Sequence, residues 1–186
     1  MIENFKIEPL TDSRFVRPAR VSYRQDGVAK SWEVVQAHDS VAVLIYHEPK
    51  DCFILVKQFR PAVYLHDKKG YTYELCAGIV DKQSSLLQIA REEIEEECGY
   101  DVPPEAIEKV TSFYTSVGFA GSKQTLFFAK VDDSMKVHEG GGIDMEQIEV
   151  VALPVLEARE FIYDETKVKT PGLMFAFLWF FDRFSR

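Results

Sequence analysis

Five glutamates crowd the segment REEIEEECGY, which runs from residue 91 to residue 100. On a helix, with about 100° between successive residues, Glu93, Glu96 and Glu97 fall within roughly a third of the circumference. Like charges at these spacings cost a few tenths of a kcal/mol per pair, and more where water is partly excluded. Such a cluster calls for a positive partner, and hard carboxylate oxygens suit Mg²⁺ or Mn²⁺. The alternative from these residues alone is a solvated acidic helix face.

The residues around the glutamates predict the helix that must carry them. Ser85, with Gln88 three residues later, fits a capping box, and Gly99 fits the left-handed residue that ends a helix. A neighbouring apolar stripe would face the core, and it consists of Leu87, Ala90, Ile94 and Cys98. The carboxylates are therefore expected along one edge of the helix, beside the core.

Strands dominate the first third of the chain. Residues 19–37 contain two β-rich runs around Gln25-Asp26-Gly27, a hairpin signal, and residues 40–59 contain two apolar runs that predict central strands buried on both faces. Shorter strands are predicted at 71–78, 108–116, 123–131 and 148–154, a flexible loop at 139–144, and helices at 155–164 and 172–181. Strands and helices mixed in this way indicate an α/β layered domain.

Composition and charge limit the function classes. The 186 residues, 46% of them hydrophobic, predict one domain over 1–186, and a net charge of −8 argues against nucleic acid or an anionic membrane as a partner. Cys52, Cys76 and Cys98 lack CxxC spacing, so reduced core thiols are expected. The N-terminus shows no secretory signal, which favours the cytoplasm, and the apolar run 172–181 is too short to span a bilayer.

The segment from Gly78 to Tyr100 resembles the Nudix box, GX5EX7REUXEEXGU, in which U is aliphatic or aromatic. The fitting positions are Gly78, Glu93, Ile94, Glu96, Glu97, Gly99 and Tyr100. Two positions depart from it: Ser84 stands where the box has its first Glu, and Glu92 where it has Arg, while Arg91 lies one place early. In the family that arginine helps to orient a metal-binding glutamate. The departures leave open a Nudix-fold protein that binds a nucleotide sugar without cleaving it.

The likeness extends beyond the box. HDSVAVLIY, LVKQFRPAVY, YELCAGIVD, SVGFAGSKQT and IEVVALP are similar to the nucleoside-diphosphate-sugar branch of the Nudix hydrolases, and closest to its UDP-sugar pyrophosphatases. The resemblance implies an α/β/α sandwich with a mixed β-sheet and an N-terminal β-hairpin. It also implies a homodimer with residues 1–38 at the interface, and Mg²⁺-dependent cleavage of UDP-glucose to UMP and glucose 1-phosphate. The alternatives are ADP-ribose, giving AMP and ribose 5-phosphate, or an acidic face that docks a basic protein.

The same resemblance assigns residues to a metal and phosphate site. Glu93, Glu96 and Glu97, together with the backbone carbonyl of Ala77, are expected to hold the metal, and Glu96 and Glu97 thereby serve catalysis. Arg60 matches an arginine that contacts the phosphates, and its fork suits that geometry. The alternative for Arg60 is a salt bridge at the edge of the sheet.

A later loop and two aromatic residues complete the expected site. Asp144 or Glu146 would supply the base that activates water, and the run Gly140–Gly142 would let this loop reach over the site. The alternative is a solvated acidic loop. Trp32 is a candidate for stacking on the nucleobase, although a core or interface tryptophan fits equally. Phe119 lies on the loop that borders the substrate in similar enzymes.

Overall fold

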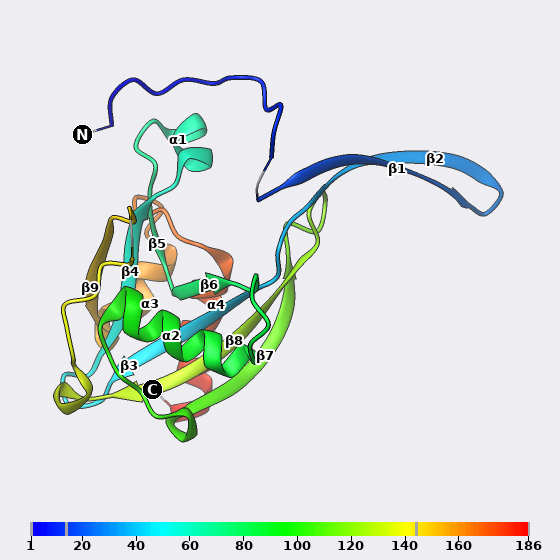
Figure 1. Ribbon diagram of the computed structural model, residues 1–186. Coiled ribbons are helices and arrows are strands. Elements are labelled where there is room, and N and C mark those ends of the chain that lie inside the picture. The colour runs from blue at the N-terminus through cyan, green and yellow to red at the C-terminus, as the bar shows by residue number, and fades with distance from the viewer. Residues whose placement is uncertain (1, 14, 144, 186) are drawn as a thin grey trace.

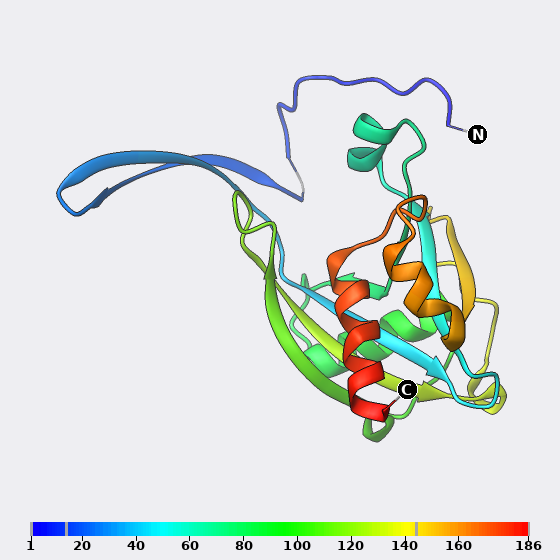
Figure 2. The ribbon, with the colours of Figure 1, turned by 180° about the vertical axis from the view of Figure 1, so that it is seen from behind.

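A mixed β-sheet lies between helices in the computed structural model of this chain. Helix α2 (Leu86–Cys98) covers one face, and helices α3 (Val155–Tyr163) and α4 (Pro171–Phe184) cover the other (Figure 1, Figure 2). The predicted α/β class and its layered arrangement are confirmed. The structure describes all residues except Met1, Arg14, Asp144 and Arg186.

Strand β3 (Ser40–His47) is the centre of the sheet. It pairs in parallel with β8 (Ser122–Val131) and antiparallel with β4 (Cys52–Phe59). β7 (Ile107–Thr115) adds to β8, and β9 (Ile148–Pro154) adds to β4. The two runs predicted as central strands are therefore β3 and β4.

β3 and β4 pair over only part of their length, and a short segment fills the fork between them. β5 (Tyr71–Glu74) pairs with the end of β4, and β6 (Cys76–Ile79) pairs with the start of β3. The prediction of one continuous strand at 71–78 is wrong, because the chain changes its partner strand at Leu75 and forms two strands. The fork also brings β6 into contact with α2.

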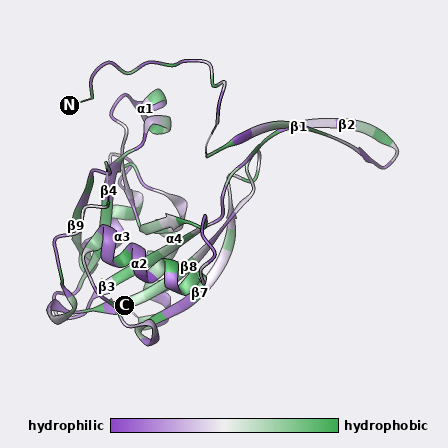
Figure 3. Ribbon diagram, in the orientation of Figure 1, coloured by the Kyte–Doolittle hydropathy of each residue, from purple (hydrophilic) through white to green (hydrophobic). Residues whose placement is uncertain are grey.

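Alternation along β3 divides the core into two layers. Val41, Val43 and Ile45 join the cluster that packs on α2, whereas Ala42 and Leu44 join the cluster that packs on α3 and α4. Figure 3 shows hydrophobic residues along these strands and a mixture of polar and hydrophobic residues on α2. Each fully buried aliphatic side chain contributes about 1.5–3 kcal/mol, so β3 is held firmly on both faces.

The hairpin β1 (Arg17–Gln25) and β2 (Val28–Gln36) projects away from the sandwich (Figure 1). Its strands pair antiparallel along their whole length, and Asp26 and Gly27 form the turn with φ of 52° and 80°. Two successive residues with positive φ match the tight turn that Asp-Gly favours between paired strands. The predicted hairpin is confirmed.

The remaining elements are short. Helix α1 (Pro61–Asp67), which the sequence analysis did not predict, follows β4, and two 3₁₀ turns, η1 (Pro104–Ala106) and η2 (Asp133–Met135), flank β7 and β8. Pro61 stands at the first helical position, where its missing N–H costs nothing. Among the described residues, no helix has both the length and the apolar character needed to cross a membrane.

Candidate active site

Local capping fixes helix α2, which carries the glutamates. The Ser85 hydroxyl oxygen accepts a hydrogen bond from the Gln88 backbone N–H at 3.1 Å, and Gly99 ends the helix with φ of 72°. The Gln88 side chain donates to Glu92 at 2.9 Å. Both predicted helix boundaries are therefore confirmed, and all five glutamates lie on one helix.

Glu97 is the deepest of the three predicted metal ligands, with only 4% of its surface exposed. Its carboxylate accepts the backbone N–H of Ala77 on β6 at 2.8 Å. Burial raises the pKa of Glu97 to about 8, because the charged form loses its hydration, and the Ala77 N–H only partly offsets this. No salt bridge from a described residue reaches this carboxylate. Burial therefore disfavours the charged form of Glu97 until a cation lies beside it, which suits this carboxyl to binding a metal ion.

Glu93 lies under Gly78, the glycine of the box. A Cβ atom on Gly78 would lie 1.8 Å from the Glu93 Oε1 atom, so this close approach requires glycine. Glu93 is half-buried, and burial, followed by repulsion from Glu96 and Glu146, raises its pKa to about 7. The pairing of Gly78 with Val41 in the sheet fixes the position at which this carboxylate is held.

Glu96 is nearer the surface, and burial again raises its pKa. The three carboxylates thus occupy one edge of α2 at different depths. Within the described part of the chain, no three Asp, Glu, His or Cys side chains converge closely enough to hold an ion as they stand. The carboxylate oxygens of these glutamates are hard donors of the type that Mg²⁺ prefers, and none of them has a salt bridge to a described residue. Joint ligation by the trio stays a prediction.

The two departures from the box have structural partners. Glu92, which replaces the arginine, forms a salt bridge with Lys82, and the charge of Lys82 offsets part of the rise that burial causes in the pKa of Glu93 and Glu96. Arg91 points elsewhere, donating to Asp101 at 2.7 Å and to the Val102 carbonyl at 3.0 Å. Lys82 therefore supplies positive charge beside the acidic edge, a role the sequence analysis did not assign to it.

Arg60 forms a salt bridge with Glu74 of β5. Its Nε donates to Oε1 and its Nη2 to Oε2, each at 2.7 Å. The salt bridge foreseen as the alternative is thus present. The Arg60 side chain is still 44% exposed. Its hydrogen bonds to Glu74 are the main reason that its pKa is raised, and the charges of Glu97 and Glu146 add to the rise, so the guanidinium lies within electrostatic reach of the acidic cluster. Contact with phosphates stays a prediction for Arg60.

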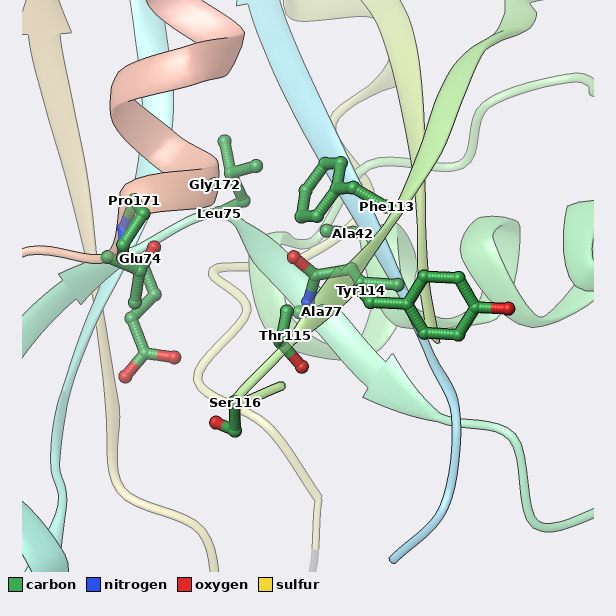
Figure 4. Close-up of a pocket in the computed structure, with 12 residues that line it drawn as sticks. Ala42, Glu74, Leu75, Ala77, Phe113, Tyr114, Thr115, Ser116, Pro171 and Gly172 are labelled. Carbon is green, nitrogen blue, oxygen red and sulfur yellow. The ribbon is translucent and has the colours of Figure 1, made fainter. Parts of the chain in front are cut away.

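A cavity of about 400 Å³ opens beside β5 and β6 (Figure 4). Glu74 and Ala77 line it, which places the cavity next to the segment that binds Arg60 and Glu97. Thr115 and Ser116 face it from the end of β7, and Gly172 faces it from the first turn of α4. The remaining lining residues are Ala42, Leu75, Phe113, Tyr114, Gln124, Thr170 and Pro171.

The glycine-rich loop is docked on the end of α2. Gly141 donates its N–H to the Glu97 carbonyl at 2.9 Å, and Gly142 donates to the Glu96 carbonyl at 3.1 Å. Glu146 accepts the Ile143 N–H at 3.0 Å and contributes to the raised pKa of all three glutamates. The glycines here permit close packing, and a lid motion of this loop stays a prediction. Asp144, the other candidate base, lies outside the described residues.

Trp32 lies on β2, and Phe119 lies on the loop between β7 and β8 to which β2 is hydrogen-bonded. The Trp32 Nε1 donates to the Gly118 carbonyl at 2.8 Å, and the Val35 N–H donates to the Phe119 carbonyl at 2.8 Å. Both aromatic side chains are exposed, and neither lines the cavity beside Ala77. The hairpin and the loop that carry these two residues are thus joined by hydrogen bonds, away from that cavity within one chain, and the contact of Trp32 and Phe119 with substrate stays a prediction.

A sheet between helical layers, with one acidic helix packed against a strand that contains Ala77-Gly78, defines a Nudix-type α/β hydrolase. Comparison with known proteins agrees: a model of the NUDIX domain matches residues 36–169. The chain belongs to the Nudix family. The predicted enzyme class is thereby confirmed.

Related proteins place the chain within the family. Uridine diphosphate glucose pyrophosphatase of Bos taurus is 38% identical, over 97% of this chain and 95% of that protein. The Mus musculus protein of the same name is 37% identical, over 92% and 90% of the two chains. A GDP-mannose pyrophosphatase of Cronobacter sakazakii is also 37% identical, over 86% and 84%. The predicted resemblance to the nucleoside-diphosphate-sugar branch is confirmed.

Proposed function

We propose that this protein hydrolyses the pyrophosphate bond of a nucleoside diphosphate sugar, with UDP-glucose as substrate and UMP and glucose 1-phosphate as products. The observation that carries the proposal is the pair of carboxylates held against β6, the buried Glu97 and the half-buried Glu93, neither of which has a salt bridge to a described residue. The names of the Bos taurus and Mus musculus relatives support the choice of sugar nucleotide. GDP-mannose is the second candidate, because the relative that cleaves it is also 37% identical.

Mg²⁺ is the proposed cofactor, with Mn²⁺ as the second choice, held by Glu93, Glu96, Glu97 and the Ala77 carbonyl. When bound, it supplies positive charge that offsets the charge of the diphosphate and the charge that develops on the phosphoryl oxygens. The Ala77 N–H fixes the Glu97 carboxylate, and Gly78 leaves room for that of Glu93. The protein therefore contributes two carboxylates, those of Glu97 and Glu93, whose positions are set by β6.

The other residues act on the substrate. Arg60 binds the phosphate oxygens through N–H donors that Glu74 leaves unused. Water adds to one phosphorus, the bond from that phosphorus to the bridging oxygen breaks, and Asp144 or Glu146 accepts the proton of the water. We also place Trp32 and Phe119 at the nucleoside. The buried, free cysteines suit the reducing cytoplasm.

The substrate is tested by turnover of UDP-glucose, GDP-mannose and ADP-ribose side by side, with the phosphorylated products identified. The proposal expects UMP and glucose 1-phosphate from UDP-glucose at the highest kcat/KM of the three, and only when a divalent cation is present. Faster release of AMP and ribose 5-phosphate from ADP-ribose would favour the alternative substrate. Tight binding of a nucleotide sugar without any product would favour a binding protein.

Cation binding is expected to raise the melting temperature of the wild-type protein. A ligand that binds only the folded state stabilises it by about 2.7 kcal/mol at a hundred times its dissociation constant. Glu97→Gln is expected to lose most of this gain, because it removes a charge from the binding edge. Glu95→Gln is the matched control: Glu95 is exposed on the same helix, so its variant should keep the gain. Differential scanning fluorimetry with and without Mg²⁺ measures both, and a wild-type curve unmoved by millimolar Mg²⁺ would contradict the assignment.

We further propose that the hairpin within residues 1–38 forms the interface of a homodimer. In the register of β1 and β2, one face of the hairpin carries Val21, Tyr23, Val28 and Trp32, all exposed in the single chain. A two-stranded hairpin is marginally stable by itself, and an exposed apolar face of this kind favours a protein partner. A second copy of the chain offers a matching face.

A charge on this face should weaken the dimer. Val21→Asp is expected to raise the dimer dissociation constant by about ten- to a hundredfold, because burying an unpaired charge costs a few kcal/mol. Ser22→Asp is the control, since Ser22 points to the opposite face of the same strand. Sedimentation equilibrium measures both variants. A monomeric wild type, or equal effects of the two substitutions, would contradict the proposed interface.

A further inference from the structure

The salt bridge between Arg60 and Glu74 holds the Arg60 guanidinium in one orientation. Arg60 stands between the end of β4 and the first residue of α1, and its backbone N–H donates to the Gly70 carbonyl at 2.7 Å. Its guanidinium meets Glu74 through two parallel N–H···O contacts of 2.7 Å each. Bidentate pairs of this kind set the orientation of the guanidinium as well as its position.

Glu74 is far less accessible than the arginine it binds. Only 9% of Glu74 and 3% of Thr72 are exposed, whereas 44% of the Arg60 side chain is. Thr72 lies two residues earlier on β5, hence on the same face, and its hydroxyl donates to the Glu74 Oε1 atom. Both carboxylate oxygens are thus occupied by donors of the protein.

The arginine keeps donors for a second anion. A guanidinium has N–H groups on Nε, Nη1 and Nη2, and Glu74 uses Nε and one side of Nη2. The Nη1 donors and the other Nη2 donor remain. Glu74 and Ala77 both line the cavity, and the Ala77 N–H donates to the Glu97 carboxylate. One short segment therefore carries both the residue that binds Arg60 and the residue that binds Glu97 (Figure 4).

We propose that Glu74, itself oriented by Thr72, is a positioning residue that holds the Arg60 guanidinium with its remaining N–H donors toward the diphosphate. This inference rests on the proposed function and adds to it the group that prepares Arg60 for binding. Because the arginine is already ordered in the free protein, the substrate does not have to immobilise a long side chain. A lysine at position 60 could not be held in this way, since an ammonium lacks the planar fork.

A double-mutant cycle separates positioning from a merely structural role. Glu74→Gln is expected to raise KM by roughly tenfold with little change in kcat, because it loosens an interaction made with both substrate and transition state. In the Arg60→Ala background the same substitution should add almost nothing, since Glu74 acts through Arg60. A rise in KM of equal size in both backgrounds, or no rise in either, would overturn the proposal.

Two further variants keep the test decisive. Glu149→Gln makes the same change in the Lys57–Glu149 salt bridge, which joins β4 and β9 and has an exposed glutamate, and it should leave KM unchanged. Thr72→Val removes only the hydroxyl that orients Glu74, so it should raise KM by roughly threefold even if Glu74→Gln fails to fold. An unchanged KM in Thr72→Val together with a raised KM in Glu149→Gln would count against the positioning role of Glu74.

A binding measurement distinguishes this inference from the proposed function. Inorganic pyrophosphate is titrated calorimetrically into the wild type, Glu74→Gln and Arg60→Ala in the presence of Mg²⁺. Similar weakening of pyrophosphate binding in the two variants supports the positioning role of Glu74 even if no nucleotide sugar is cleaved. In that case only the proposed function fails. Unchanged pyrophosphate binding in Glu74→Gln, with weakened binding in Arg60→Ala, overturns the positioning role of Glu74 and leaves the proposed function unaffected.

Discussion

Glu97→Gln is expected to lower kcat for the nucleotide sugar by on the order of a thousandfold, because it removes the most buried charge from the proposed cation site. The fold should survive the change. The amide oxygen can still accept the Ala77 N–H that the carboxylate accepts at 2.8 Å, and a neutral group is easier to bury than an ion. Steady-state turnover with product analysis measures the loss, and circular dichroism and the melting temperature without metal report the fold.

The control for this prediction is on the same helix. Glu95→Gln changes the same chemical group at an exposed position one turn from Arg91, and its turnover should match that of the wild type. Retained turnover in Glu97→Gln would show that the Glu97 carboxylate is not required for hydrolysis. Equal losses in both variants would show that the overall charge of α2, rather than one buried carboxylate, governs activity.

Local sequence signals were sufficient for the elements that carry the glutamates. Ser85 and Gly99 mark the ends of α2 because capping and left-handed residues depend on a few neighbouring atoms. Asp26-Gly27 marks the hairpin for the same reason. A family motif singled out Gly78 and Glu93 without indicating that they meet, and the structure supplies the reason for the glycine, because a Cβ atom at position 78 would collide with the Glu93 carboxylate.

Contacts that depend on tertiary register could not be predicted in this way. Glu74 meets Arg60 because β5 pairs antiparallel with the end of β4, directly before Arg60, and the sequence of residues 71–78 does not reveal this pairing. One signal was available, namely an acidic residue within an otherwise apolar strand, which calls for a partner. α1 was missed because residues 61–67 are too few to show a helical period.

The unusual Glu92 illustrates how a motif departure can be compensated from another segment. The family's arginine at that position would supply positive charge near the metal-binding glutamates, and here Lys82 brings a cation to the same edge by pairing with Glu92. Lys82 lies in the turn before α2, so no pattern within the helix could have indicated it. The departure therefore changes where the cation comes from and leaves the three glutamates in place.

Gly78→Ala is expected to reduce kcat/KM by about a hundredfold, since displacing a catalytic group by about 1 Å is enough for such a loss. The new Cβ would lie 1.8 Å from Oε1, 2.1 Å from Cδ and 2.6 Å from Cγ of Glu93. All three atoms belong to one side chain that can rotate away, so Glu93 should leave its place while the sheet stays intact. Activity should therefore fall much further than the melting temperature.

The origin of this loss can be checked through the cation. If Gly78→Ala acts by expelling Glu93, it should lose as much of the Mg²⁺-induced rise in melting temperature as Glu93→Gln does, and the double variant should lose no more than either. Calorimetry with and without Mg²⁺ gives the three values. Full Mg²⁺ stabilisation in Gly78→Ala would mean that Glu93 binds the cation from another position, and that the glycine serves only the packing of β6 on α2.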